Sequence, residues 1–208
     1  MNRRDFIKAA GGLIATAMLP SCTEARDKES LLKNEDRPGF YIRFYKPFRP
    51  IDISKWSLEI KGLCKRPLRL KMDDIKRLPS QTQTSRLKCV ECWSAKAKWK
   101  GFRPSVLIEI AQPLESARFL YFHAADDYYE YISFEDLLKP RVLFAYEMND
   151  KPLPPEHGAP LRLIIPFKYG YKNVKTITRL IFTDKGKEGY WSKYGYSADA
   201  TIQPGLDY

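Results

Sequence analysis

The chain has 208 residues, 44% of them hydrophobic and 29% charged, which is typical of a folded soluble protein with room for one domain and a real core. The formal net charge of +11 suits an anionic membrane or an acidic partner, or simply marks a solvated basic face. The lysines are scattered and no RNA- or DNA-binding motif occurs, so nucleic acid is excluded as a partner.

The first 22 residues have the pattern of an export signal. Arg3 and Arg4 precede an apolar run over about residues 9–19, and small residues come before Cys22. This pattern resembles the twin-arginine signal, which carries folded proteins across the membrane, so we predict a periplasmic protein. The apolar run is too short and too rich in Gly and Ala for a good membrane span. The alternative is an amphipathic first helix of the domain.

Residues 19–22 resemble a lipoprotein cleavage box, although proline at its second position is unusual. Cys22 would then become the lipidated first residue and anchor the protein to the membrane, whereas ordinary cleavage nearby is the alternative. Residues 23–38 are polar and charged, which predicts a tether. Residues 39–208 predict a single domain without internal repeats.

The rest of the chain alternates short strands with a few short helices. The predicted strands are, in chain order, 56–62, 84–90, 118–123, 128–133, 141–148, 161–166 and 174–183. The predicted helices are 72–78, 104–111 and 134–138. Residues 99–102, with their glycine, are expected to form a loop. Many strands with few helices predict a β-rich α+β domain.

Cys89 and Cys92 are separated by two residues in the stretch KCVECW. A zinc site needs about four ligands, and only Cys64, His123 and His157 are at hand to join the pair. A thiol redox pair usually opens a helix, yet no helical apolar stripe follows Cys92. Two buried structural thiols are the third possibility. Three cysteines after residue 22 are an odd number for an oxidising compartment, which favours one thiol with a separate task.

Three motifs resemble, in order and spacing, those of the sulfite oxidase family of molybdenum enzymes. The first is RLKCVECWS at 86–94, followed by WKGF at 99–102. The second is EMNDKPLPPEHGAPLRL at 147–163, and the third is PFKYGYKNVK at 166–175. The similarity covers about residues 56–196 and is closest to the periplasmic members that reduce methionine sulfoxide.

The resemblance implies a mixed, β-rich sulfite-oxidase-type domain that binds molybdenum–molybdopterin. In that family the cysteine at the position of Cys89 gives its thiolate to molybdenum, which suits a soft anionic ligand. The position of Cys92 is usually occupied by another residue type, so Cys92 is not expected to be a ligand.

The resemblance also implies residues that would hold the pterin and its phosphate, which attracts cations and backbone N–H groups. Arg162 is the candidate cation, and Lys175 with the backbone of Asn173 and Val174 would complete the cradle. His157 would hydrogen-bond the cofactor.

Further candidates come from positions that match the family less closely. Tyr41 and Arg43 lie where the family has its first pterin contacts, although the segment departs from the usual asparagine-containing form. Tyr128 is the candidate active-site tyrosine, and Tyr129 and Tyr131 are alternatives. For Trp99, beside the cysteine motif, packing is favoured over a role at the substrate.

These features predict an exported oxidoreductase that transfers an oxygen atom to or from a small sulfur compound, and we expect sulfoxide reduction. The chain has no CxxCH haem motif and no second cysteine cluster, so electrons would come from a separate membrane haem subunit or a cytochrome. The alternatives are a sulfite-oxidising enzyme that reduces a cytochrome c, and a non-catalytic lipoprotein binding module on the same fold. Few residues follow the family region, so the dimerisation domain of sulfite oxidases is not expected and the catalytic chain should be a monomer.

Overall fold

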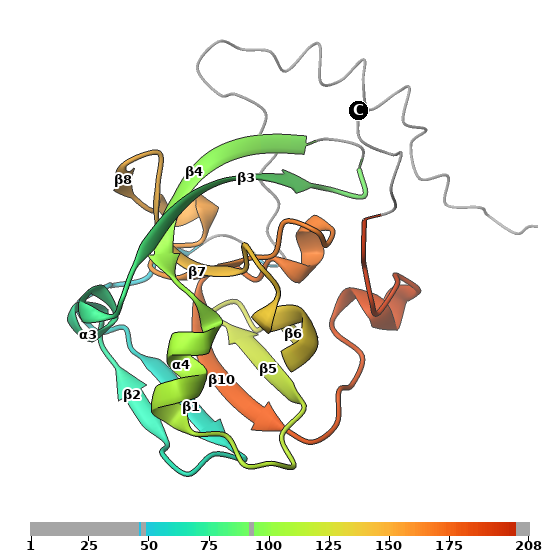
Figure 1. Ribbon diagram of the computed structural model, residues 1–208. Coiled ribbons are helices and arrows are strands. Elements are labelled where there is room, and N and C mark those ends of the chain that lie inside the picture. Colours follow the sequence, from blue (N-terminus) through green and yellow to red (C-terminus); the bar gives the residue numbers. More distant parts are fainter. Residues whose placement is uncertain (1–45, 47–48, 92–93, 203–208) are drawn as a thin grey trace, which may run out of the picture.

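The computed structural model describes residue 46 and residues 49–91 and 94–202. The predicted signal, cleavage box and tether lie outside these residues, as do Tyr41, Arg43 and Cys92. In the part described, two five-stranded sheets and a few short helices form the fold. In Figure 1 the first sheet occupies the lower half of the view, and a long hairpin of the second sheet extends across the top. The β-rich α+β prediction is therefore confirmed.

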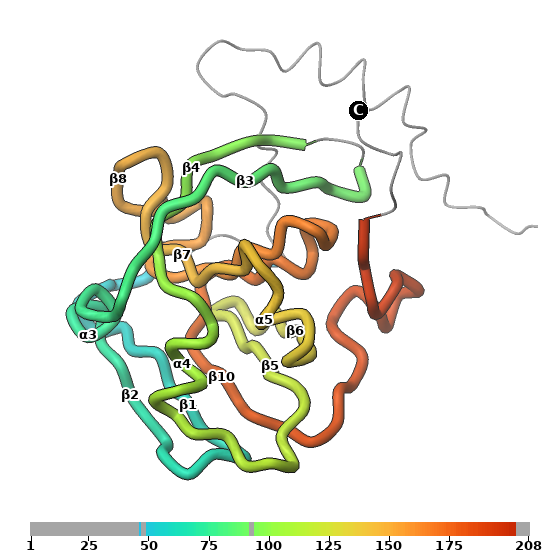
Figure 2. Tube along the Cα trace, viewed as in Figure 1, coloured from blue at the N-terminus to red at the C-terminus, as the bar shows by residue number. Residues whose placement is uncertain are grey.

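The first sheet is mixed, because its first and last strands along the chain are parallel neighbours. β1 (Leu58–Gly62) pairs in parallel with β10 (Ile177–Thr183), and all other pairs are antiparallel. Figure 2 shows this pairing as a cyan segment beside an orange-red one. The strand order is β2 (Leu68–Leu70), β1, β10, β5 (Phe119–Ala124) and β6 (Tyr129–Ser133).

The second sheet is antiparallel and carries the cysteine motif at one end of its hairpin. Its order is β3 (Gln81–Lys88), β4 (Ser94–Phe102), β7 (Leu143–Met148) and β8 (Lys151–Pro152), and β9 (Arg162–Ile164) also pairs with β7. β3 and β4 pair from Gln81–Gly101 to Lys88–Ser94, so Cys89 follows directly on the paired strands.

Short helices connect the strands. The α-helices are α3 (Met72–Arg77), α4 (Pro104–Ala111) and α5 (Phe134–Leu138), and the 3₁₀ turns are η1 (Pro155–His157), η2 (Gly170–Lys172) and η3 (Trp191–Tyr194). Proline opens α4, where a missing N–H costs nothing. The Ser133 hydroxyl caps α5 by accepting from the Asp136 N–H. Among the described residues no helix is long and apolar enough to cross a membrane.

Aromatic residues from both sheets meet in the main core. Phe144 of β7 stacks on Phe102 of β4 at 5.1 Å and on Phe122 of β5 at 5.9 Å between ring centroids, and all three are fully buried. These contacts join the two sheets, because β5 belongs to the first sheet and β4 and β7 to the second. A smaller core lies within the second sheet and contains Trp99, which has no exposed surface.

The expected loop at residues 99–102 is wrong, because these residues form the second half of β4. Ala95, Ala97 and Trp99 point inward and alternate with lysines, which is the pattern of a half-buried strand. Gly101 marks a close approach of two strands rather than a turn. A Cβ placed there would lie 1.8 Å from the Phe144 carbonyl oxygen, and the β4–β7 register shifts at this point.

Candidate functional site

The third motif packs directly against the cysteine motif. A Cβ placed on Gly170 would lie 3.5 Å from the Lys88 carbonyl oxygen and 3.9 Å from the Cys89 Cα. Cys89 is half-buried, and its Sγ lies 3.9 Å from Glu91 Oε2. The end of the β3–β4 hairpin and the loop around η2 therefore form one surface, which holds a thiol.

Arg162 is a buried cation beside this surface. Its side chain reaches from β9 into the interior and is 5% exposed. Nη1 donates to the His157 carbonyl at 2.8 Å, Nη2 donates to the Asn173 carbonyl at 3.5 Å, and the guanidinium lies 5.1 Å from the centroid of the Trp99 ring. Burial lowers the pKa of Arg162 to about 10, so it stays charged at neutral pH.

Nε of Arg162 is the unsatisfied atom of this side chain. It is buried and has no hydrogen-bond partner among the described residues. Among the described residues, Arg162 also forms no ion pair with a carboxylate. A buried charge with an unused donor is costly unless an anion meets it, so the arrangement suits a phosphate or a carboxylate ligand.

Lys175 adds positive charge near Arg162, whereas His157 beside them is a neutral imidazole at neutral pH. Burial, followed by the charge of Arg162, lowers the pKa of Lys175 to about 8 and that of His157 to about 4. Lys175 Nζ donates to the Glu156 carbonyl at 3.4 Å. Gly158 has a φ of 105°, and a Cβ there would come within 2.8 Å of Lys175 Cβ. The tight turn after η1 thus presses against Lys175.

Asn173 and Val174 hold the loop together instead of offering free N–H groups. The Asn173 N–H donates to the Gly170 carbonyl at 3.0 Å, and the Val174 N–H donates to the Lys172 carbonyl at 3.1 Å. The Asn173 side chain accepts from the Ile165 N–H at 2.6 Å and donates to nearby carbonyls. Both N–H groups are thus engaged within the loop, and their role in binding a phosphate stays a prediction.

Tyr128 contacts the third-motif loop, and it does so as a hydrogen-bond donor. Its hydroxyl donates to the Tyr171 carbonyl at 2.8 Å. Burial, with the nearby Glu130 carboxylate, raises the pKa of Tyr128 far above its ordinary value, so the phenol stays neutral. Tyr129 and Tyr131 instead pack around Tyr121, with ring centroids 6.1 and 4.9 Å from it.

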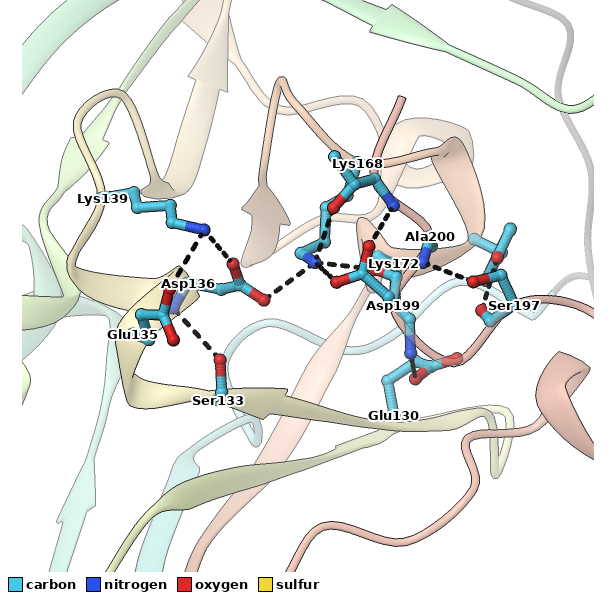
Figure 3. A network of polar contacts seen from close by, with 12 residues as sticks. Glu130, Ser133, Glu135, Asp136, Lys139, Lys168, Lys172, Ser197, Asp199 and Ala200 are labelled. Atoms are coloured by element: carbon cyan, nitrogen blue, oxygen red, sulfur yellow. Dashed lines mark hydrogen bonds and ion pairs between the residues drawn. The ribbon is translucent and has the colours of Figure 1, made fainter. Parts of the chain in front are cut away.

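Two buried lysines in the third motif were not predicted as functional residues. Figure 3 shows Lys168 between Asp136 and Asp199, with Nζ 2.8 Å from a carboxylate oxygen of each. Lys172 Nζ lies 2.5 Å from Glu130 Oε2 (Figure 3), and both residues are buried. These ion pairs fix the loop to α5, to β6 and to the C-terminal segment around Asp199. The sequence signal was weak, because each carboxylate lies far from its lysine along the chain.

Trp99 packs in the core, as expected. Its ring is fully buried and lies under the Arg162 guanidinium. Within residues 46, 49–91 and 94–202 no three His, Cys, Asp or Glu side chains gather as a metal site. The site thus combines one thiol, a set of buried cations and a loop fixed by ion pairs.

Comparison with known proteins gives one family and several relatives. The family model described as an oxidoreductase molybdopterin binding domain matches residues 45–191. The protein-methionine-sulfoxide reductase catalytic subunit MsrP of Campylobacter jejuni is 29% identical over 245 residues, which cover 100% of this chain and 82% of the relative. The protein of the same name from Xanthomonas campestris is 29% identical over 214 residues, covering 88% of this chain and 66% of the relative.

A solved structure shares the fold. The sulfane dehydrogenase SoxCD from Paracoccus pantotrophus superposes with a TM-score of 0.68 at 24% identity, and the match covers 72% of this chain. This chain spans 43% of that protein's chain and just under two thirds of the Xanthomonas relative.

Proposed function

The chain belongs to the family of oxidoreductase molybdopterin binding domains and is a molybdopterin-dependent oxidoreductase, and on that basis we propose that it reduces sulfoxides with electrons from a separate haem protein. The family resemblance noted in the sequence is thereby confirmed. The names of the two relatives support a sulfoxide, and methionine sulfoxide in proteins is the substrate class they suggest.

The described residues fit a molybdopterin. The cofactor carries a phosphate, and the buried Arg162, with its unsatisfied Nε–H and with Lys175 nearby, offers a positive site for it. Cys89 would supply a thiolate for the metal from the adjoining hairpin end. Bound there, the cofactor would supply the two-electron oxygen-atom chemistry.

The residues around the site would hold the cofactor and the substrate in position. Reduction of a sulfoxide takes up two electrons and two protons and yields a thioether and water. Tyr128 remains protonated, so its hydroxyl holds the Tyr171 carbonyl and orders the loop rather than acting as a base. The ion pairs of Lys168 and Lys172 fix the same loop, which passes close to Cys89 at Gly170. Such rigidity keeps a bound cofactor in one orientation.

One observation carries the proposal: the Gly170 loop meets the cysteine hairpin beside a buried arginine with an unused donor. The test is metal analysis of the mature protein made in cells that synthesise the cofactor. We expect about one molybdenum per chain and reduction of methionine sulfoxide driven by reduced benzyl viologen. Cys89→Ser should lose both, while Cys64→Ser, which changes a thiol elsewhere, should keep both.

The same preparation separates the alternatives. Oxidation of sulfite by ferricyanide or cytochrome c, without sulfoxide reduction, would favour the sulfite-oxidising reading. Absence of molybdenum from protein made in competent cells would favour a non-catalytic binding module.

For the cellular setting, we infer export by the twin-arginine route to the periplasm, a domain over residues 39–208 and a monomeric catalytic chain. The support for export is the sequence: Arg3 and Arg4, the short apolar run and the cleavage-box resemblance at Cys22. Labelling of cells with radioactive palmitate checks the lipid anchor. Cys22→Ala should abolish the label if the box is used, and an unlabelled wild-type protein would reject the lipid.

A further inference from the structure

Aromatic side chains form a continuous series of ring contacts between the η2 loop and the surface of η3. Tyr171 contacts Tyr196 at 5.6 Å between ring centroids, and Tyr196 contacts Trp191 at 5.4 Å. Trp191 in turn lies 6.0 Å from Tyr194. Each distance is within the range of direct packing between aromatic rings.

The inner end of this series adjoins the cysteine motif. Tyr171 follows Gly170, where an added Cβ would lie 3.5 Å from the Lys88 carbonyl oxygen and 3.9 Å from the Cys89 Cα. The Tyr171 hydroxyl donates to the Ser197 carbonyl at 2.7 Å, which fixes the ring toward the C-terminal segment.

The outer end is exposed. Tyr194 is 64% exposed and Trp191 is 37% exposed. Lys193 lies between them in sequence, is also exposed, and places its ammonium 5.2 Å from the centroid of the Tyr129 ring. We call Trp191, Lys193 and Tyr194 the aromatic patch. Tyr and Trp are enriched at protein interfaces and often dominate their binding energy.

We propose that the aromatic patch is the docking surface for the haem protein that delivers electrons, and that the series from Trp191 through Tyr196 to Tyr171 is the packed path toward Cys89. The inference rests on the proposed function, because sulfoxide reduction requires electrons from outside the chain. Two ferrous haems would be oxidised for each sulfoxide, with two protons taken up and water and thioether released.

The patch and the path suit this partner for separate reasons. Electron tunnelling weakens steeply across gaps, so contiguous rings couple the surface to the metal-binding loop better than loosely packed side chains would. Protein partners that exchange electrons usually make small, transient contacts, and a patch of two aromatic rings fits that size. Lys193 and the basic net charge of the chain would attract an acidic surface around a haem edge.

The docking test uses an acidic, ferrous c-type cytochrome as the probe. Its binding to the molybdenum-loaded enzyme is measured by surface plasmon resonance, and its oxidation by the same enzyme with methionine sulfoxide is followed by absorbance. Trp191→Ala and Tyr194→Ala should each weaken binding about tenfold and slow cytochrome oxidation in proportion. Ile53→Ser changes an apolar residue of 48% exposure outside the patch and should leave both unchanged.

The path test leaves the patch intact. Tyr196→Leu removes the ring that contacts both Tyr171 and Trp191. Binding of the cytochrome should stay at the wild-type value, whereas electron transfer at saturating cytochrome should slow. Unchanged electron transfer in this variant would overturn the path.

Reduced benzyl viologen separates this inference from the proposed function, because a small dye needs no docking surface. If viologen drives no sulfoxide reduction in the wild type, the proposed function has failed. If viologen supports turnover but the cytochrome does not bind, or binds the patch variants as tightly as the wild type, the docking surface is wrong.

Discussion

The buried lysines of the loop at residues 166–173 and the buried arginine on the neighbouring strand differ in how their charges are compensated. Lys168 and Lys172, within the loop, meet carboxylates at 2.8 and 2.5 Å. Arg162, on the neighbouring strand, meets two carbonyl oxygens and the face of Trp99, and its Nε is left without a partner among the described residues.

The carboxylate partners make Lys168 and Lys172 structural cations, whereas Arg162 keeps a charge that a ligand can meet. The charge of a buried ammonium is compensated when a carboxylate pairs with it. Removing either member leaves the other as an uncompensated charge in a low-dielectric interior. A buried guanidinium held by neutral carbonyls keeps its net charge, so an incoming anion would gain from meeting it. Substitution of the paired lysines should therefore affect mainly stability, and substitution of Arg162 should affect mainly anion binding.

The largest effect on stability should come from breaking the Glu130–Lys172 pair. Lys172→Met leaves the Glu130 carboxylate buried, and Gly189 closes over it so tightly that a Cβ there would lie 2.1 Å from Oε2. We expect a loss of about 3–5 kcal/mol in the free energy of unfolding, measured by urea denaturation of the metal-free protein. The double variant Glu130→Gln/Lys172→Met should recover most of this loss. Equal stability of the single variant and the wild type would show that the pair carries no such cost.

On the other side of the loop, Arg162→Met should change ligand binding more than stability. Inorganic phosphate, as the simplest anion, should stabilise the metal-free wild type by roughly 2.7 kcal/mol at a concentration 100 times its Kd. The variant should lose this stabilisation, while its stability without phosphate falls less than that of Lys172→Met. Arg69→Met is the matched control, because Arg69 is 69% exposed on the first sheet. A phosphate response that survives in Arg162→Met would contradict an anion site at this arginine.

The neutral His157 beside Arg162 should make the free energy of unfolding depend on pH. Burial and the charge of Arg162 lower the pKa of His157 from 6.5 to about 4 in the folded protein. Between these values the unfolded chain binds more protons than the folded one, so stability should rise with pH from about 4 to 6.5. His157→Gln should flatten that rise in urea titrations of the metal-free protein. Bound phosphate should also reduce it, because an anion raises the pKa of a nearby imidazole.

Sequence patterns predicted most of the strands because one face of each is buried. In β1 and β5 buried and partly exposed residues alternate, and that alternation is visible in the sequence. No strand was predicted over β4, and its end at residues 99–102 was expected to be a loop because of Gly101. Its glycine is required by the close approach of β7, a tertiary contact with no local sequence signal.

The site could be predicted only in part, for a similar reason. The three motifs pointed to Cys89, Arg162 and Lys175, and the structure places Arg162 and Lys175 together beside the Gly170 contact with Cys89. Cofactor binding by these residues stays a prediction. The buried ion pairs were not foreseen, because Lys172 and Glu130 are 42 residues apart and only the fold brings them together.

The smallest effect should come from Asp199, the exposed member of the ion pairs. Its side chain is 69% exposed, against 14% for Asp136, and both contact Lys168. The hydrogen bond from Lys168, followed by that from Thr201, lowers the pKa of Asp199 to about 2, so its contribution exists above pH 3.8 and is lost as the pH falls toward 2.

Asp199→Asn should therefore cost only about 0.2–1 kcal/mol at neutral pH in urea denaturation, since solvent screens an exposed pair and the Asp199 carbonyl still accepts from Lys168 at 2.7 Å. Asp136→Asn should cost more, because its carboxylate is nearly buried and Lys168 would lose its shielded partner. If the two variants are equally destabilised, burial of the carboxylate does not set the strength of these pairs. The distinction between compensated and uncompensated cations would then rest on Lys172 and Arg162 alone.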